Sequence, residues 1–387
     1  MEVRARAPGK IILTGEHAVV HGSTAVASSI DLYTYVYLHF STPSDDGDLL
    51  KLQLKDSALE FSWPVSRIRA AFPESAGLLS CTPTSCSVEN AKTIAALVEE
   101  LNIPEAKIGL AAGVSAFLWL YSSIQGFKPA TVVVTSELPL GSGLGSSAAF
   151  CVALASALLA FTDSVSLDLN HQGWRSFEEK DLELVNKWAF EGEKIIHGKP
   201  SGIDNTVSAY GNIISFKSGN LTRTKSSMTL KMLITNTKVG RNTKALVAGV
   251  GERMLRHPEI MAFVFSAVDS ISKELTSVLK SPTPDELSVT EKEERIEELM
   301  EMNQGLLQSM GVSHAAIETV LRTTLKYKLA SKLTGAGGGG CVLTLLPTLL
   351  SGTVVDKVVA ELESSGFQCF IAGIGGGGVE INFGISS

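Results

Sequence analysis

The residues with the clearest chemical potential form a glycine-rich stretch near the middle of the chain. It runs from residue 141 to 147 and reads Gly-Ser-Gly-Leu-Gly-Ser-Ser. Glycine lets a backbone turn tightly and approach a ligand closely, because it has no side chain. The two serines fall where a helix is expected to begin, and a helix start presents unpaired N–H groups and the positive end of a dipole. This combination binds anions, most often phosphate groups.

The flanking sequence predicts a strand before these glycines and a helix after them. A β-branched run covers residues 131–135, and small and apolar residues fill 148–159. In this context we expect the loop to hold the phosphates of a nucleotide triphosphate, with a flexible turn as the alternative. Ser146 or Ser147 is expected to cap the helix, and either hydroxyl is also a suitable Mg²⁺ ligand.

Neither of the two common nucleotide-binding signatures is present in a convincing form. A Walker A loop requires a lysine directly after its last glycine, and no glycine stretch of this chain has one. The pattern GxGxxG occurs formally at Gly335–Gly340, but a helical pattern precedes it and a strand-like run follows it. A dinucleotide-binding fold needs the opposite order. The sequence therefore disfavours both a P-loop ATPase and a dehydrogenase.

Three charged residues are candidates for metal binding and proton transfer. Glu193 flanks the apolar stripe of a predicted helix over 181–196, so it is expected to face inward as a Mg²⁺ ligand, unless it is an ordinary surface residue. Asp204 follows the end of that helix, where the alternative is an Asx turn or a helix N-cap. Lys10 follows Ala-Pro-Gly at the entrance to a strand, where an exposed lysine is the alternative.

Two further groups of polar residues could meet a substrate. Glu16 and His17 lie between apolar runs near the start of the chain, and a structural histidine is the alternative for His17. Arg241 lies between a predicted strand at 230–236 and a helix, where its fork of donors could hold a carboxylate. A surface arginine at a helix start is the alternative there.

Composition limits the class of protein. The net charge is −7 and the pI about 5.6, which argues against a general nucleic-acid binder. The five cysteines are scattered; Cys81 and Cys86 do not have CxxC spacing, and the other three are expected to be buried thiols in a reducing compartment. The N-terminal residues lack the apolar core of a signal peptide, and no run reaches transmembrane length. These features predict a soluble, cytoplasmic protein with no membrane or nucleic-acid partner.

A shift in composition near residues 218–227 suggests a boundary between two domains, 1–224 and 225–387. In the second domain we expect helices over about 243–280, 290–330 and 354–364. Strands are expected at 230–236, 341–346 and 379–383.

Three stretches taken together resemble the GHMP small-molecule kinases. Residues 7–22, containing Ala-Pro-Gly-Lys and Gly-Glu-His, are similar to the first motif of that family. Residues 139–149 are similar to the second motif, the ATP loop, and residues 332–340 to the third. Galactokinases continue Gly-Glu-His with Thr-Asp-Tyr, where this chain has Ala-Val-Val, and homoserine kinases lack Gly-Glu-His. Residues 186–205 and 235–243 resemble the members that phosphorylate mevalonate.

This resemblance implies an α/β (α+β) fold with an N-terminal half like the second domain of ribosomal protein S5 and a ferredoxin-like C-terminal half. It implies ATP-dependent phosphorylation of the 5-hydroxyl of (R)-mevalonate to 5-phosphomevalonate in isoprenoid and sterol precursor synthesis. It also implies Mg²⁺, a homodimer and feedback inhibition by prenyl diphosphates. Another kinase of the family, such as one acting on phosphomevalonate, and a non-catalytic sensor of the same fold remain as alternatives.

The resemblance also implies a role for each candidate residue. Asp204 is expected to act as the base or to orient the hydroxyl, and Lys10 to stabilise charge on the transferred group. Ser147 and Glu193 are the expected Mg²⁺ ligands. The residues expected to bind ATP are Lys10, Ser136, Gly141, Ser142, Gly143, Leu144, Gly145, Ser146 and Ser147. Those expected to bind mevalonate are Glu16, His17, Asp204, Arg241, Thr243 and Ala336. The run Gly335–Gly340 is expected to let the C-terminal half close tightly over the site, with no room for side chains.

Overall fold

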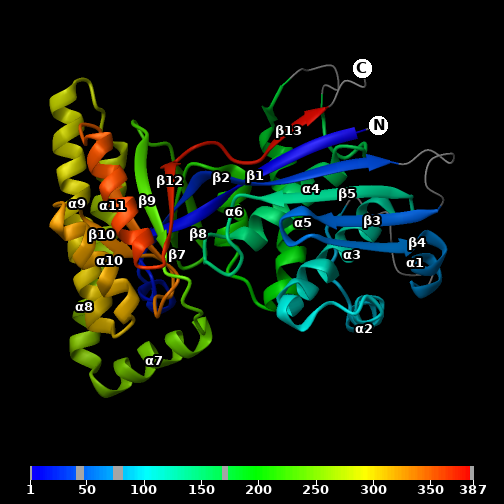
Figure 1. The fold of residues 1–387 in the computed structure, drawn as a ribbon, viewed down its shortest axis with the longest axis horizontal. Coiled ribbons are helices and arrows are strands. Elements are labelled where there is room, and N and C mark those ends of the chain that lie inside the picture. The colour runs from blue at the N-terminus through cyan, green and yellow to red at the C-terminus, as the bar shows by residue number, and fades with distance from the viewer. Residues whose placement is uncertain (1, 41–47, 73–81, 168–172, 384–387) are drawn as a thin grey trace.

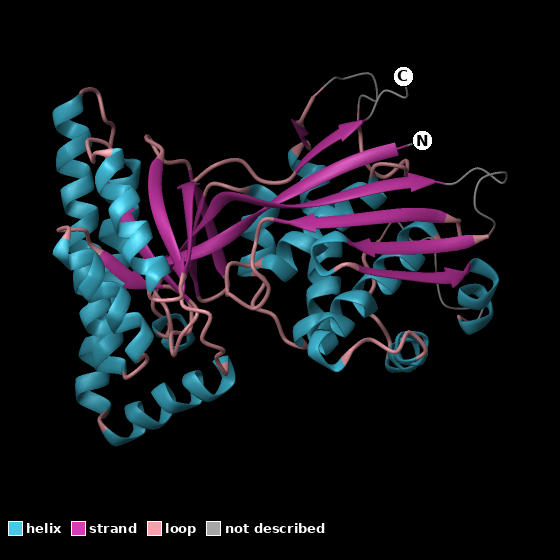
Figure 2. Ribbon diagram, in the orientation of Figure 1, coloured by secondary structure: helices cyan, strands magenta, loops and turns pink. Residues whose placement is uncertain are grey.

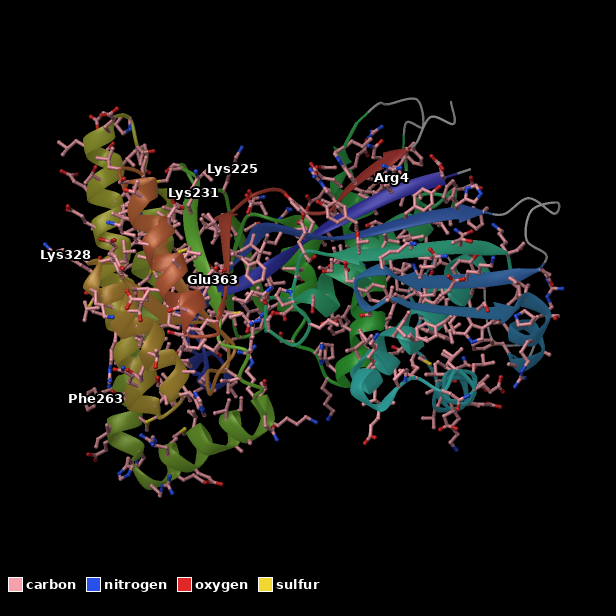
Figure 3. The ribbon with its side chains drawn as sticks, in the orientation of Figure 1. Arg4, Lys225, Lys231, Phe263, Lys328 and Glu363 are labelled. Atoms are coloured by element: carbon pink, nitrogen blue, oxygen red, sulfur yellow. The ribbon has the colours of Figure 1, made fainter. Side chains whose placement is uncertain are left out.

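A computed structural model describes residues 2–40, 48–72, 82–167 and 173–383. One mixed sheet of 13 strands runs through these residues, with the order β10-β11-β9-β12-β2-β1-β13-β6 along its main path. Figures 1 and 2 show helices packed against this sheet in two groups, one at each end of the molecule. Charged side chains such as Arg4 and Lys231 point outward (Figure 3).

The N-terminal half contains strands β1 to β8 and helices α1 to α6. The strands are β1 (Glu2–Thr14), β2 (Ala25–Phe40), β3 (Leu49–Leu54), β4 (Leu59–Pro64), β5 (Ala130–Ser136), β6 (Arg175–Ser176), β7 (Ile213–Lys217) and β8 (Asn220–Thr224). The helices are α1 (Val65–Ala71), α2 (Val88–Glu99), α3 (Ala111–Gln125), α4 (Ser146–Leu159), α5 (Glu179–His197) and α6 (Ile203–Tyr210), with short 3₁₀ turns at Ala18–His21, Lys55–Ser57 and Glu105–Leu110.

The C-terminal half contains the remaining elements. They are β9 (Leu230–Asn236), α7 (Thr243–Arg256), α8 (Pro258–Lys280), α9 (Glu286–Met310), α10 (Ala315–Lys326), β10 (Ser331–Leu333), β11 (Cys341–Leu346), α11 (Gly352–Ser364), β12 (Gln368–Ile374) and β13 (Glu380–Phe383). Strands β10, β11, β9 and β12 pair antiparallel in that order. Along the chain, helices α7 to α10 lie between β9 and β10, and α11 lies between β11 and β12. This arrangement is the expected ferredoxin-like half.

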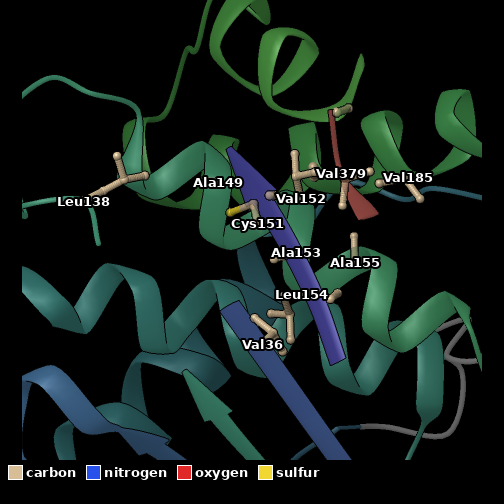
Figure 4. Close-up of a cluster of buried hydrophobic side chains, with 14 of the residues drawn as sticks. Val36, Leu138, Ala149, Cys151, Val152, Ala153, Leu154, Ala155, Val185 and Val379 are labelled. Atoms are coloured by element: carbon tan, nitrogen blue, oxygen red, sulfur yellow. The ribbon is translucent and has the colours of Figure 1, made fainter. Parts of the chain in front are cut away.

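Helix α4 is the centre of the N-terminal core because it is apolar on every side. Residues 151–159 are all buried, and the helix packs on α5, α3, β1 and β2 (Figure 4). A helix that is apolar all round must be surrounded by protein. Its start, which carries the glycine loop, is therefore held in a fixed place.

Strand β2 alternates between buried and half-buried residues. Val36 and Leu38 are fully buried, whereas Tyr35 and Tyr37 on the other face are half-buried. The buried face meets the helical layer because successive side chains of a strand point to opposite faces.

The two halves are not separated cleanly at residue 225. That position falls between β8 and β9, but β12 pairs with β2 and the last strand, β13, pairs with β1. A second link is Asp269 of α8, which accepts hydrogen bonds from the Thr24 N–H (2.7 Å) and the Lys217 ammonium (3.1 Å). Strands from both sides of the predicted boundary therefore belong to one continuous sheet.

Several local predictions differ from the structure. The sequence indicated no strand at β10, β4 or β12, because short strands inside glycine-rich or mixed segments carry little periodicity. Residues 88–93 form the start of α2, where the Ser87 side chain caps the helix by accepting a hydrogen bond from the Asn90 N–H. Contrary to expectation, the segment Lys107–Gln125 is long and apolar enough to cross a membrane, judged by length and composition alone. However, 61% of its apolar stretch is buried inside the protein. This burial is typical of a core helix.

The cysteines follow the prediction in part. Cys151 and Cys341 are buried, Cys369 is only half-buried, and Cys81 lies outside the described residues.

Candidate active site

The glycine loop joins β5 to α4 through backbone conformations that favour glycine. Gly143 and Gly145 have φ values of +85° and +77°. Gly145 is the N-cap of α4, and no side chain caps the helix, so the predicted serine cap is wrong. Ser146 and Ser147 are instead the first two helical residues. Among the residues that the structure describes, the N–H groups of the first turn therefore have no side-chain partner, and they remain available to an anion.

Strand β1 lies directly against this loop. The Lys10 N–H donates to the Leu144 carbonyl at 2.8 Å. A Cβ atom at Gly9 would lie 2.5 Å from a methyl carbon of Leu138 and 2.8 Å from the Leu144 oxygen. Only glycine permits this approach, which explains why Lys10 follows a glycine. The first two sequence motifs thus form one surface.

The side chains of Lys10 and Asp204 meet beside the loop. Lys10 Nζ lies 3.2 Å from Asp204 Oδ2, with the lysine side chain 8% exposed and the aspartate 35%. Asp204 lies in the first turn of α6, whose N-cap is Gly202 and not Asp204. The alternatives of an exposed lysine and a capping aspartate are therefore both wrong. The ion pair places a cation and a carboxylate where the anion site opens to solvent.

Glu193, in the last part of α5, lies at the same place. It is 2% exposed, and its Oε1 is buried without a hydrogen-bond partner among the described residues. Burial raises the pKa of Glu193 to about 7; the negative charge of Asp204 adds to this rise, while Ser147 and Lys10 oppose it. A desolvated carboxylate beside a second carboxylate gains stability in its ionised form when a further cation binds next to it.

These residues fit a Mg²⁺ ion. The unpartnered Glu193 oxygen and the Ser147 hydroxyl are oxygen donors of the kind Mg²⁺ prefers. Within the described parts of the chain, no three His, Cys, Asp or Glu side chains form a metal cage. Mg²⁺ usually takes one or two carboxylates and completes its shell with phosphate oxygens and water.

Glu16 does not reach the substrate end of the site. Its carboxylate accepts hydrogen bonds from Lys332 Nζ at 2.5 Å and Asn303 Nδ2 at 3.2 Å, and its side chain is 0% exposed. Burial lowers the pKa of Lys332, and Glu16 opposes this shift. The expected contact of Glu16 with substrate is corrected, because a carboxylate fully enclosed by protein partners has no free oxygen for a ligand. It joins the first motif to the third.

His17 lies beside the third motif in a strained backbone conformation. Its φ is +60°, which non-glycine residues rarely adopt. Its Nε2 lies 2.8 Å from the Ala336 carbonyl oxygen, whereas Nδ1 is buried without a partner in the described structure. The structure therefore brings His17 and Ala336 together and leaves one ring nitrogen for a ligand.

The side chain of Arg241 lies between the glycine loop at 141–147 and the glycine run Gly335–Gly340. Its Nη2 donates to the Ser142 carbonyl at 3.3 Å. A Cβ at Gly143 would lie 1.5 Å from Nη2, and one at Gly340 would lie 2.4 Å from Nη1. Burial lowers the pKa of Arg241, opposed by Cys341 and Asp204, and Nη1 has no partner within the described chain. The glycines thus form a slot for a buried guanidinium with a free donor.

The third motif packs mainly against its own half of the protein. Cβ atoms at Gly337 and Gly339 would lie 2.2 Å from the Val312 oxygen and 2.7 Å from the Val239 oxygen. At Gly335 the nearest atom would be 3.5 Å away, so a side chain meets no clash there, contrary to the prediction. The tight packing is therefore internal to the C-terminal half, and not a closure over the site.

The other predicted residues lie further from this centre. Thr243 is the first residue of α7 and is exposed, with no side-chain contact joining it to the rest of the site in the described structure. Ser136 ends β5, where its hydroxyl meets Thr34 Oγ1 at 2.8 Å and accepts from the Leu138 N–H at 3.2 Å. These bonds shape the approach to the loop.

Sequence reasoning missed three residues of this region. His197 Nε2 lies 3.0 Å from Ser147 Oγ, Lys332 pairs with Glu16, and Thr334 exchanges hydrogen bonds with the backbone of Ile12 at 2.9 and 3.0 Å. Only His197 carried a signal, because it lies four positions after Glu193 and so shares a helix face with it. The partners of the other two are more than 300 residues away in sequence.

Comparisons with known proteins agree with this geometry. A family model described as the GHMP kinases N terminal domain matches residues 110–212, and one described as GHMP kinases C terminal matches residues 288–352. The mevalonate kinase of Arabidopsis thaliana is 69% identical over 383 residues, covering 98% of this chain and 100% of that protein. This chain belongs to the mevalonate kinases of the GHMP kinase family.

More distant members share the fold. The mevalonate kinase of Homo sapiens is 42% identical, covering 97% of this chain and 94% of that protein. A crystal structure of the L. major mevalonate kinase in complex with R-mevalonate has a TM-score of 0.68 at 21% identity, covering 95% of this chain and 94% of that chain. The two-domain GHMP kinase fold predicted from the motifs is confirmed.

Proposed function

We propose that the protein transfers the γ-phosphoryl group of ATP to the 5-hydroxyl of (R)-mevalonate, forming 5-phosphomevalonate and ADP. The observation that carries this proposal is the Lys10–Asp204 ion pair, at 3.2 Å, beside an uncapped helix start with a glycine loop. Relatives at 69% and 42% identity, both named mevalonate kinase, support the choice of substrate.

The chain's own groups account for the transfer. The N–H groups at the start of α4 hold the phosphates in place, so the reacting oxygen and phosphorus can be aligned. Asp204 accepts the proton of the attacking hydroxyl or orients it, and the adjacent Lys10 ammonium stabilises the charge that develops on the transferred group. A metaphosphate-like transition state asks little of a base, so orientation and charge are the larger contributions.

Ser147 and Glu193 would hold Mg²⁺, which when bound neutralises phosphate charge. The role of Glu193 is supported by its buried, unpartnered oxygen and its raised pKa. Both features describe a carboxylate whose burial is only partly offset by Lys10 and Ser147, so a bound cation would stabilise its ionised form.

His17, Ala336 and Arg241 form the proposed mevalonate end of the site. Each of the first two sits at the contact between the first and third motifs, and the free Nη1 of Arg241 is a donor suited to a carboxylate. Thr243 would join them only after a movement of the start of α7. Glu16 acts behind this surface, holding His17 in place through the backbone.

The remaining expectations are part of the same proposal. The protein would work as a homodimer in the cytoplasm, with prenyl diphosphates competing at the phosphate loop as feedback inhibitors. Its product would feed isoprenoid and sterol precursor synthesis.

The decisive experiment is an ATP-dependent phosphorylation screen over mevalonate, phosphomevalonate, galactose and homoserine. We expect turnover with mevalonate and little with the others. Preferred turnover of phosphomevalonate would overturn the substrate assignment but keep the kinase. ATP binding without turnover of any substrate would identify a sensor.

The assigned roles have their own test. Asp204→Asn and Lys10→Met are each expected to lower turnover at least about 10²-fold, because general-base and charge-stabilising groups contribute that much or more. ATP binding, measured by calorimetry, should stay near that of the unchanged protein. Turnover close to normal in either variant contradicts the role given to that residue.

A further inference from the structure

His197 is the last residue of α5, directly at the candidate metal site, and no role has been given to it so far. Its Nε2 lies 3.0 Å from Ser147 Oγ and 4.0 Å from Glu193 Oε2. The side chain is 52% exposed, so it contributes little to the core. A histidine at a helix end with this exposure would ordinarily be expendable for folding.

The hydroxyl of Ser147 explains why this neighbour matters. A serine hydroxyl has one hydrogen and two lone pairs, and it binds a cation through a lone pair. Its hydrogen must then point away from the cation, toward an acceptor. His197 Nε2, 3.0 Å from Ser147 Oγ, is a suitable acceptor. The Ser147 hydroxyl also interacts with the Glu193 carboxylate, but that carboxylate is needed as the second cation ligand.

The fold sets this arrangement firmly. Ser147 is the second residue of α4, and Glu193 and His197 lie one turn apart on α5, on one face of the helix. Helices α4 and α5 pack against each other through the buried core. Gly198, with φ +75°, ends α5 immediately after the histidine and leaves its ring at the edge of the site.

We infer that His197 is a positioning residue for the metal site: it accepts the Ser147 hydrogen and so turns a lone pair of that hydroxyl toward the cation. This inference rests on the proposed function, because it takes Ser147 and Glu193 as the Mg²⁺ ligands. Residues that orient a metal ligand in this way typically affect metal affinity or activity by about 10- to 100-fold.

The test compares two replacements of the same residue. His197→Leu removes the acceptor, whereas His197→Gln places an amide oxygen near the position of Nε2. Mn²⁺ replaces Mg²⁺, and its binding to the full-length protein with a non-hydrolysable ATP analogue is measured by electron paramagnetic resonance. Steady-state rates are recorded in parallel, and urea unfolding checks that both variants fold normally.

We expect His197→Leu to weaken Mn²⁺ binding about 10- to 100-fold, and His197→Gln to restore most of it. The KM for mevalonate should change little in both. Unchanged Mn²⁺ binding in His197→Leu, or equal losses in the two variants, would overturn the inference while leaving the kinase assignment intact. If the unchanged protein binds no Mn²⁺ with the nucleotide analogue, the metal site itself is wrong, and the inference fails with it.

Discussion

Replacing Lys332 by methionine tests whether the ion pair beneath the site holds the first and third motifs together. The pair is fully enclosed, with side-chain exposures of 1% for Lys332 and 0% for Glu16. Methionine fills a similar volume but leaves the Glu16 carboxylate without its cation. Of the donors in the described part of the chain, Asn303 then remains. Removing one partner of a buried pair costs about 3–5 kcal/mol, because the remaining charge stays desolvated.

The assay is the free energy of unfolding from urea titration, for Lys332→Met, Glu16→Gln and the double variant. We expect each single change to destabilise the protein and the double variant to cost less than the sum, because two neutral side chains leave no buried charge. The matched control is Lys187→Met, which breaks an exposed pair with Glu183 and should change the free energy of unfolding very little, because solvent screens the pair.

Two results would refute this reasoning. One is a cost for Lys332→Met no larger than that of the control. The other is additivity of the two single changes, which would show that Lys332 and Glu16 do not act as a pair. Because His17 follows Glu16 and meets Ala336, a folded Lys332→Met variant is also expected to show a raised KM for mevalonate.

Three further predictions follow from the site and its surroundings. Gly143→Ala should raise the KM for ATP by about tenfold more than the control Gly141→Ala. Both positions have positive φ, but of these two only Gly143 would place the new Cβ against Arg241. Equal effects of the two changes would contradict the proposal that Gly143 makes room for the Arg241 side chain. Glu193→Gln should raise the Mg²⁺ concentration for half-maximal rate by about tenfold, corresponding to roughly 1.4 kcal/mol, and an unchanged Mg²⁺ requirement would remove Glu193 from the metal site. Although burial opposes its ionisation, hydrogen bonds from two lysines and a threonine hold the pKa of Asp269 well below its usual range. The ionised form of Asp269 therefore stabilises the folded state above about pH 4, and this contribution is lost as the pH falls toward the lowered pKa. In Asp269→Asn, the free energy of unfolding should therefore fall less steeply between about pH 4 and more acidic pH than in the unchanged protein.

The sequence alone was sufficient for the parts of this protein whose physics is local. The glycine loop, the apolar helix after it and the alternating strand β2 all have patterns in which each residue's neighbours along the chain decide its structure. The order of the three motifs then identified the family, since glycines are placed where a backbone must come close to a phosphate or to another backbone. Lys10, Asp204 and Glu193 were candidates by residue type and by position relative to predicted elements, and the resemblance to the family implied their roles.

The tertiary structure decided every question about partners. Glu16 was expected to bind substrate, but its carboxylate pairs with Lys332, which lies 316 positions away in the chain. Arg241 was expected to hold a carboxylate, but the sequence did not indicate that its side chain lies in a slot formed by glycines of two separate motifs. His197 gained a role only because α4 and α5 pack together. Burial and charge pairing depend on contacts between distant segments, and no pattern along the chain records which segments will meet.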